Sequence, residues 1–349
     1  MSAAPARAVR LGATLALAMA AGALAQRLRM PLPWMLGPLL ATAAASMAGL
    51  PLAGSTRLRQ VGQGLIGVAL GLYFTPAVLA MLVQLAPAIA VSVAWALALG
   101  YGFYRFLHWS QRGEVDRATA FYSAAIGGAS EMAVLAERAG ARVDRVAAAH
   151  SLRVLLVVVI VPFAFQALDL HGSDPTRRAG GAVVWAHLLP LLAVSAAGGM
   201  LLRRWHVPNP WVLGALAVTA THTALQAPPT ALPPLLANAA QLAIAVSLGT
   251  RFTPEFLRAA PRWLGAVALG TLVMLAASAA FGTLLALALG RAPATLVLAT
   301  TPGGIAEVAI TASVLGLGAP VVTAFQVMRY IAVLLGIQPL YRWAAQPRQ

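Results

Sequence analysis

The stretch Gly127-Gly128-Ala129-Ser130-Glu131 lies inside a long apolar run, and Gly303-Gly304-Ile305-Ala306-Glu307 repeats it 176 residues later (307 − 131). Two glycines weaken a membrane helix and permit it to break. A charged carboxylate at that depth costs about 2.5–3.5 kcal/mol, so it indicates a function by default. Pro302 precedes the second pair and removes one more backbone donor. The sequence therefore predicts two broken helices, each with a carboxylate beside the break.

The matched spacing continues beyond the two glutamates. Arg153 and Arg329 each follow their glutamate by 22 residues (153 − 131 and 329 − 307), in the next apolar segment. An Arg–carboxylate pair would offset part of the burial cost and keep the carboxylate ionised. The alternatives are an arginine that snorkels to a lipid headgroup and a glutamate satisfied by a neighbouring helix. We predict a substrate or ion site that comprises Glu131, Glu307, Arg153, Arg329, Gly127, Gly128, Gly303 and Gly304.

Two other motifs recur in the same order. The Pro-x-Pro-Trp-x-Leu-Gly segment at 31–37 returns at 208–214, and the segment 63–76, which ends in Phe-Thr-Pro, returns at 241–254. Each of the latter segments opens with a glutamine, Gln63 or Gln241. A buried amide can bind a polar ligand, and it is as often a hydrogen bond between two helices. Both glutamines therefore join the candidate site with the two interpretations open.

Three recurring patches indicate an internal duplication, with a first membrane repeat at 8–170 and a second at 182–345. The period is too long for a solenoid, whose repeats have roughly 20–50 residues. It is typical of a carrier built from two related halves. The start of the chain resembles a cleavable signal peptide, but the matching stretch 184–203 lies mid-chain, so we expect 8–26 to be a retained helix. The short Pro-Trp segments favour an odd number of crossings and hence inverted halves, with parallel halves as the alternative.

Composition defines the class of protein. The 349 residues are 60% hydrophobic and only 9% charged, with a mean hydropathy of +0.81. Such a chain has too little polar surface for a soluble fold. Apolar runs close to the ~20 residues that cross a bilayer follow one another, about 12 in all. We therefore predict an all-α, polytopic membrane protein of about 10–12 helices, with two duplicated halves and broken, crossing helices.

Residue usage excludes several kinds of chemistry. The net charge of +15 comes from arginines, nearly all of which lie at the ends of the apolar runs or in short loops. This distribution is a topology signal and not a nucleic-acid footprint. The chain has no cysteine and no lysine, so thiol and Schiff-base chemistry are excluded. Its six histidines show no metal-ligand spacing, and the glycine pairs lack the residues of a phosphate loop. We expect no catalytic residue, no metal, no cofactor and no enzymatic activity.

These paired motifs resemble those of the duplicated bacterial membrane family called AbrB or AmoA-like, over about residues 8–345. Members are catalogued as transcriptional regulators or as ammonia monooxygenases, so the resemblance implies a link to gene regulation but no mechanism. The order of elements is more distantly similar to the cation/proton antiporter and bile-acid symporter superfamily, which implies two broken helices that cross. The Asp-Asp or Asn-Asp pair of the antiporters is absent, so cation–proton exchange is not expected.

The sequence favours a secondary transporter of a small organic, anionic metabolite in the bacterial inner membrane. A membrane sensor without flux is the alternative, and an oxygenase is disfavoured because its ligand set is missing. The expected partners are the lipid bilayer and a small-molecule substrate, with no direct nucleic acid; a homodimer is compatible with the sequence. The substrate, the coupling ion and the membrane orientation are not encoded in any motif.

Overall fold

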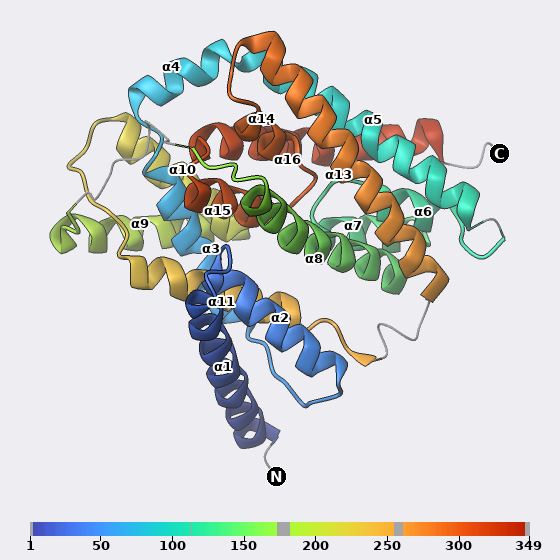
Figure 1. The fold of residues 1–349 in the computed structure, drawn as a ribbon, viewed down its shortest axis with the longest axis horizontal. Coiled ribbons are helices and arrows are strands. Elements are labelled where there is room, and N and C mark those ends of the chain that lie inside the picture. The colour runs from blue at the N-terminus through green and yellow to red at the C-terminus, as the bar shows by residue number, and fades with distance from the viewer. Residues whose placement is uncertain (1–2, 112, 173–181, 255–260, 346–349) are drawn as a thin grey trace. The chain divides into compact units, whose positions relative to one another are not determined.

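The computed structural model describes residues 3–111, 113–172, 182–254 and 261–345, and these form α-helices and no β-strand (Figure 1). The first helices are α1 (Ala3–Arg27), α2 (Pro33–Met47), α3 (Thr56–Gly71), α4 (Pro76–Gln84), α5 (Ala86–Ser110), α6 (Arg117–Ala124), α7 (Ala129–Arg138) and α8 (Val143–Ala167). The later helices are α9 (Trp185–Arg204), α10 (Pro210–Ala224), α11 (Pro234–Gly249), α13 (Pro261–Leu289), α14 (Pro293–Thr300), α15 (Ile305–Leu315) and α16 (Ala319–Ala344). The predicted all-α class is confirmed.

Helix lengths repeat along the chain in the order that a duplication requires. Helices α2 and α10 both have 15 residues, and a proline occupies the first position of each. Helices α3 and α11 both have 16 residues, and α6 and α14 both have 8. This agreement supports the duplication, which remains a prediction, as do the repeat limits.

Six helices in the described part of the chain are long and apolar enough to cross a membrane, which is typical of a polytopic membrane protein. They are α1 (from Arg7), α5, α8, α9, α13 and α16. Helices α3 and α4 pass the same test together, but the chain bends by 86° between them. Full spans are fewer than the apolar runs because other runs are divided into helices of 8 to 16 residues.

The helices form two compact units, and each unit takes helices from both predicted repeats. The first unit comprises Met1–Ala80, Val161–Leu170 and Asp174–Ala259, and therefore holds α1 to α3 and α9 to α11. The second unit comprises Met81–Ile160, His171–Ser173 and Ala260–Gln349, and holds α5 to α7, most of α8, and α13 to α16. Compact packing therefore divides the chain differently from sequence similarity.

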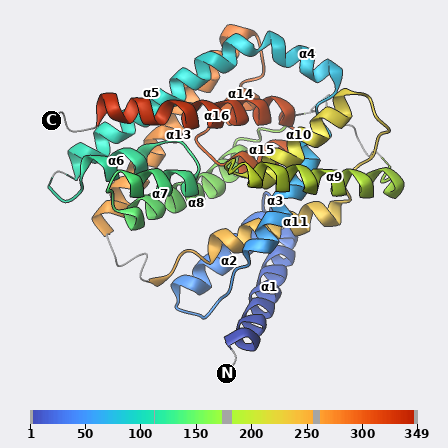
Figure 2. The same cartoon turned by 180° about the vertical axis from the view of Figure 1, so that it is seen from behind.

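In the first unit, α3 and α11 pack against each other. Helix α3 also packs on α10, and α11 packs on α2, so each contacts a helix of the other predicted repeat. Figure 1 shows α11 beside α2, and Figure 2 shows the neighbourhood of α3 and α9 from behind. Glycines make these approaches close. A Cβ at Gly71 would overlap Thr219 of α10, and a Cβ at Gly249 would overlap Thr42 of α2. Lipid provides no hydrophobic driving force between helices, so helices associate through the close packing that small residues allow.

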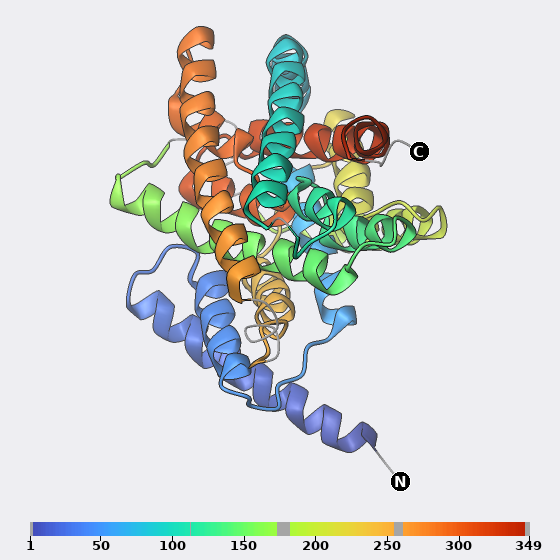
Figure 3. The same cartoon turned by 90° about the vertical axis from the view of Figure 1, so that its right-hand side faces the viewer.

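In the second unit, α5 and α13 run side by side (Figure 3), and the rings of Trp95 and Phe281 stack between them at 4.6 Å. The most buried long helices of the chain are α8 and α16. In the most apolar stretch of each candidate span, 50% of the residues of α8 and 56% of those of α16 are buried, compared with 22% in each of the other four spans. These two interior helices carry Arg153 and Arg329.

Candidate functional site

Both predicted helix breaks are confirmed. Helix α6 ends at Ala124 and α7 begins at Ala129, and helix α14 ends at Thr300 and α15 begins at Ile305. Gly128 and Gly304 are the N-caps of α7 and α15, with extended ψ angles of 142° and 150°. Each break exposes the carbonyls at the end of one half-helix and the N–H groups at the start of the next. We call the segment 125–128 the first break and the segment 301–304 the second break.

The first break is held by Arg153, which is only 3% exposed. Its Nη1 donates to the carbonyl of Ala125 at 2.9 Å, and its Nη2 donates to the carbonyl of Gly127 at 3.5 Å. The same Nη2 lies 2.8 Å from Nδ1 of His150. A guanidinium at the carboxyl end of α6 faces the negative end of that helix dipole. Arg153 therefore satisfies carbonyls that the break leaves without helical partners.

The second break is held in the same way by Arg329, which is 6% exposed. Its Nη1 donates to the carbonyl of Thr301 at 2.7 Å, and its Nη2 donates to the carbonyl of Gly303 at 2.6 Å. Each accepting carbonyl lies 176 residues after its counterpart at the first break (301 − 125 and 303 − 127). The two contact sets thus follow the spacing of the sequence motifs.

Two further residues, His150 and Gln326, bind the breaks, although neither was predicted as a site residue from the sequence. His150 Nε2 lies 2.9 Å from the carbonyl of Tyr122, and Gln326 Nε2 donates to the carbonyls of Leu298, Ala299 and Thr301 at 3.4, 3.1 and 3.0 Å. Both side chains are fully buried. Each precedes its arginine by three residues, close to one helical turn. This shared spacing was the signal that could have identified them.

The tautomer of His150 follows from its neighbours. The carbonyl of Tyr122 can only accept, so Nε2 must carry the proton that is donated to it. Nδ1 is then the acceptor for the Arg153 guanidinium. His150 is therefore a neutral bridge between α6 and Arg153.

The glutamates lie at the opposite ends of the breaks. Glu131 and Glu307 are half-buried and occupy the first turns of α7 and α15. A Cβ at Gly128 would overlap the carboxylate of Glu131, and a Cβ at Gly304 would overlap that of Glu307. Each carboxylate therefore folds back over its N-cap, where a helix start is partly positive. This explains why glycine precedes the glutamate by three residues; an Arg–Glu pair remains a prediction.

The two breaks are close to one another in the second unit. A Cβ at Gly128 would lie 3.3 Å from the ring of Tyr330, the neighbour of Arg329 on α16. A Cβ at Gly303 would lie 3.0 Å from Val157, one turn beyond Arg153 on α8. Helices α8 and α16 therefore each bind one break and flank the other, so the four charged residues belong to one region.

Some buried polar atoms near the breaks have no hydrogen-bond partner among the described residues. These are Oε1 of Gln326, Nε of Arg329, and the hydroxyls of Ser123 and Ser278. Ser278 lies beside the second break, since its carbonyl accepts from Thr300 Oγ1 at 3.2 Å. A buried unsatisfied polar group costs about 1–3 kcal/mol. Such atoms mark places that a water molecule or a polar ligand can satisfy.

Gln63 and Gln241 belong to the first compact unit, whereas the break residues belong to the second. Their helices, α3 and α11, meet where a Cβ at Gly62 would approach the Ala240 carbonyl at 2.8 Å. Gln241 is buried and Gln63 is half-buried. Their role in the site therefore stays a prediction.

Comparison with known proteins gives consistent matches. A family model described as "Transition state regulatory protein AbrB" matches residues 34–345. The chain is 27% identical to the "Uncharacterized protein YhjN" of Bacillus subtilis (strain 168), over 88% of this chain and 86% of that protein. It is 26% identical to the "Putative regulator AbrB" of Escherichia coli (strain K12), over 88% of each chain. No solved structure matches the chain significantly.

Proposed function

The chain belongs to the AbrB family, and we propose that it is a secondary transporter of a small organic anion in the bacterial inner membrane. The observation that carries the proposal is the pair of matched helix breaks, each with a buried arginine and a half-buried glutamate. Broken helices inside a membrane protein supply freed backbone groups for a substrate or an ion. Non-helical backbone at that depth is tolerated only where protein or a water-filled cavity surrounds it.

Several features favour an anionic substrate. Arg153 and Arg329 cover the carbonyl ends of the breaks, so the negative ends of the half-helices are already neutralised. Nε of Arg329 is a buried donor without a partner in the described chain. The net charge of +15 attracts anions over a longer range. A carboxylate that accepts from Arg329 would satisfy an atom that the protein itself leaves unsatisfied.

Uptake into proteoliposomes tests the proposal. Purified full-length protein is reconstituted and supplied with radiolabelled pyruvate, succinate and citrate in separate assays, with imposed sodium or proton gradients. We expect saturable uptake of at least one acid above protein-free liposomes, and its loss in Arg329→Ala. The matched control is Arg203→Ala, which removes an exposed arginine at the end of α9. Absence of uptake for a broad panel of organic acids, under every gradient, would contradict transport.

A second candidate is a membrane sensor that binds the same ligand without flux. The names of the similar proteins favour it, since the matching family model is called a regulatory protein and the Escherichia coli relative is called a regulator. None of the three names of the family model and the two relatives describes an enzyme. Saturable ligand binding by purified protein that is unable to move the ligand across liposomes would favour the sensor.

A further inference from the structure

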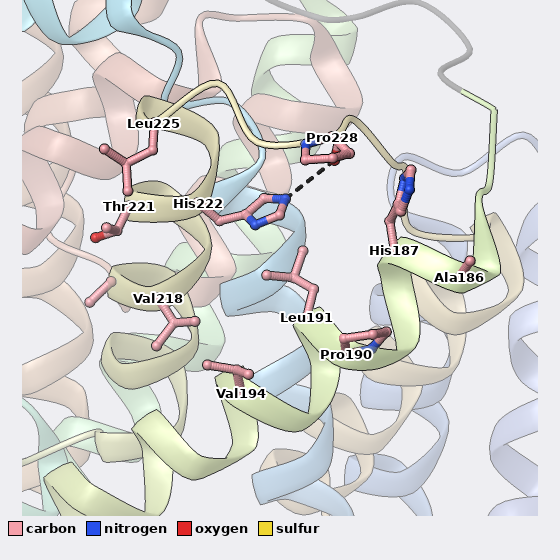
Figure 4. A pocket seen from close by; sticks show the side chains of 11 residues that line it. Ala186, His187, Pro190, Leu191, Val194, Val218, Thr221, His222, Leu225 and Pro228 are labelled. Carbon is pink, nitrogen blue, oxygen red and sulfur yellow. Dashed lines mark hydrogen bonds between the residues drawn. The ribbon is translucent and has the colours of Figure 1, made fainter.

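A cavity of about 650 Å³ lies between α9 and α10, beneath the loop that follows α10 (Figure 4). Its walls include His187, Pro190, Leu191, Val194, Val218 and His222. All of its lining residues fall within the first compact unit, whereas the break residues fall within the second. The volume lies within the roughly 300–1,000 Å³ of small-molecule sites.

Two histidines fix one end of this cavity. His222 Nε2 lies 3.3 Å from the carbonyl of Pro228, and His187 Nδ1 lies 3.4 Å from the carbonyl of Pro229. Thr230 anchors the same loop, because its hydroxyl exchanges two hydrogen bonds of 3.3 Å with the backbone of Val184. Carbonyls only accept, so these two ring nitrogens carry the protons. Nδ1 of His222 and Nε2 of His187 then have no partner among the described residues.

The rest of the cavity is apolar. Leu191 and Val194 project from α9, and Val218 projects from α10 on the facing side (Figure 4). Val194 is 56% exposed, so the apolar wall continues to the surface of its helix. A molecule that fills this space therefore needs an apolar body with a polar group at the histidine end.

Charge identifies the polar group. The described part of the first unit contains one acidic residue, Asp169. Its arginines are Arg7, Arg10, Arg27, Arg29, Arg57, Arg59, Arg203, Arg204 and Arg251. This excess of positive charge attracts an anion and repels an amine. Each open nitrogen carries a lone pair, so it can accept from the O–H of a carboxylic acid, and the proton that acid and imidazole share makes this hydrogen bond a charge-assisted one.

We propose that this cavity binds an amphipathic carboxylic acid, with its chain between α9 and α10 and its carboxyl group at His187 and His222. The proposal does not depend on the transporter, because it concerns residues of the first unit only. A neutral acyl chain from bulk lipid would fill the apolar walls but leave both open ring nitrogens without partners. An anionic phospholipid also joins acyl chains to a negatively charged group, so the test separates it from a free fatty acid.

Equilibrium binding of tritiated decanoate to the full-length protein in detergent tests the proposal. Decanol and decylamine serve as competitors of equal chain length, and dioleoyl phosphatidylglycerol serves as the phospholipid competitor. We expect saturable decanoate binding, with decanol and decylamine competing at least 10-fold more weakly. Strong competition by phosphatidylglycerol would assign the site to a lipid and overturn a free acid as the occupant. Equal competition by decanol and decylamine would show apolar filling alone and overturn the proposal.

Variants locate the binding. Val194→Trp fills the cavity from its exposed edge and leaves both histidines unchanged; we expect at least a 10-fold loss of decanoate affinity. Val91→Trp on α5 is the matched control, since Val91 is 52% exposed and lies in the second unit. His222→Ala should weaken decanoate about 10-fold and decanol by less than 2-fold. An equal loss in Val91→Trp, or an unchanged affinity in both Val194→Trp and His222→Ala, would place the ligand elsewhere.

Discussion

The two breaks share their arginine contacts but differ at the residue three positions earlier. At the first break, His150 bonds the carbonyl of Tyr122 through one ring nitrogen and Arg153 through the other. At the second break, Gln326 donates its amide group to three carbonyls, while its Oε1 and Nε of Arg329 are buried without partners in the described chain. The first break has one such atom nearby, the Ser123 hydroxyl, whereas the second break has these two and the Ser278 hydroxyl. We infer that a polar ligand binds at the second break.

Removing either arginine should give the largest loss of stability. Arg153→Ala leaves two carbonyls and Nδ1 of His150 unsatisfied. Arg329→Ala leaves only the Gly303 carbonyl unsatisfied, because the Thr301 carbonyl still accepts from Gln326 Nε2 and from the Gly303 N–H. Each change should lower the free energy of unfolding by about 2–5 kcal/mol. Thermal unfolding in detergent measures it, with Arg203→Ala as the control. Arg153→Ala should cost more than Arg329→Ala; the reverse order would break the comparison.

Alanine at the N-cap glycines should have the next largest effect. In Gly128→Ala and Gly304→Ala, the new methyl group overlaps the carboxylate of Glu131 or Glu307. We expect a loss of about 1–3 kcal/mol. The double variant Gly304→Ala/Glu307→Ala should recover part of it, because the methyl group then meets no carboxylate. Strictly additive losses in this double-mutant cycle would show that the carboxylate does not fold over the glycine.

These breaks show how much the sequence could predict. Gly-Gly pairs, Pro302 and two isolated glutamates were sufficient to place both breaks and to single out Arg153 and Arg329. The pattern did not reveal that the guanidiniums bind backbone carbonyls, because a sequence records side chains and not the backbone groups that a break frees. His150 and Gln326 were passed over since one is an imidazole and the other an amide, and their equivalence is visible only through their shared carbonyl partners.

The compact units were not predictable from the repeats. The predicted repeats at 8–170 and 182–345 relate residues by similar sequence, whereas burial depends on which helices are in contact. Gly71 contacts Thr219 and Gly249 contacts Thr42, so some of the close approaches join one predicted repeat to the other. A motif search compares equivalent positions, and these contacts join positions that are not equivalent.

Exchanging Gln326 and His150, the residues in which the two breaks differ, should change the free energy of unfolding by a smaller amount. Gln326→His would give Arg329 the acceptor that Arg153 has, but its one N–H would replace an amide that donates to three carbonyls. We therefore expect the free energy of unfolding to change by less than about 1 kcal/mol, the net value of one hydrogen bond. The same variant should bind ligand more weakly, because the second break then satisfies itself. The reverse variant, His150→Gln, should lose stability at the first break. Unfolding in detergent and uptake in proteoliposomes measure the two effects; unchanged uptake in Gln326→His would remove the second break from the ligand site.

Neutralising the glutamates should change stability least. Glu131→Gln and Glu307→Gln keep a side chain of the same shape, and glutamine also serves at this position of a capping box. We expect each variant to lose less than about 1 kcal/mol, because only the interaction of the charge with the helix dipole is removed. Uptake should nevertheless be abolished in both if the proposed role of the glutamates depends on their charge and not on helix capping. Full uptake by the double variant would reduce both glutamates to helix caps and leave the arginines as the charged groups of the site.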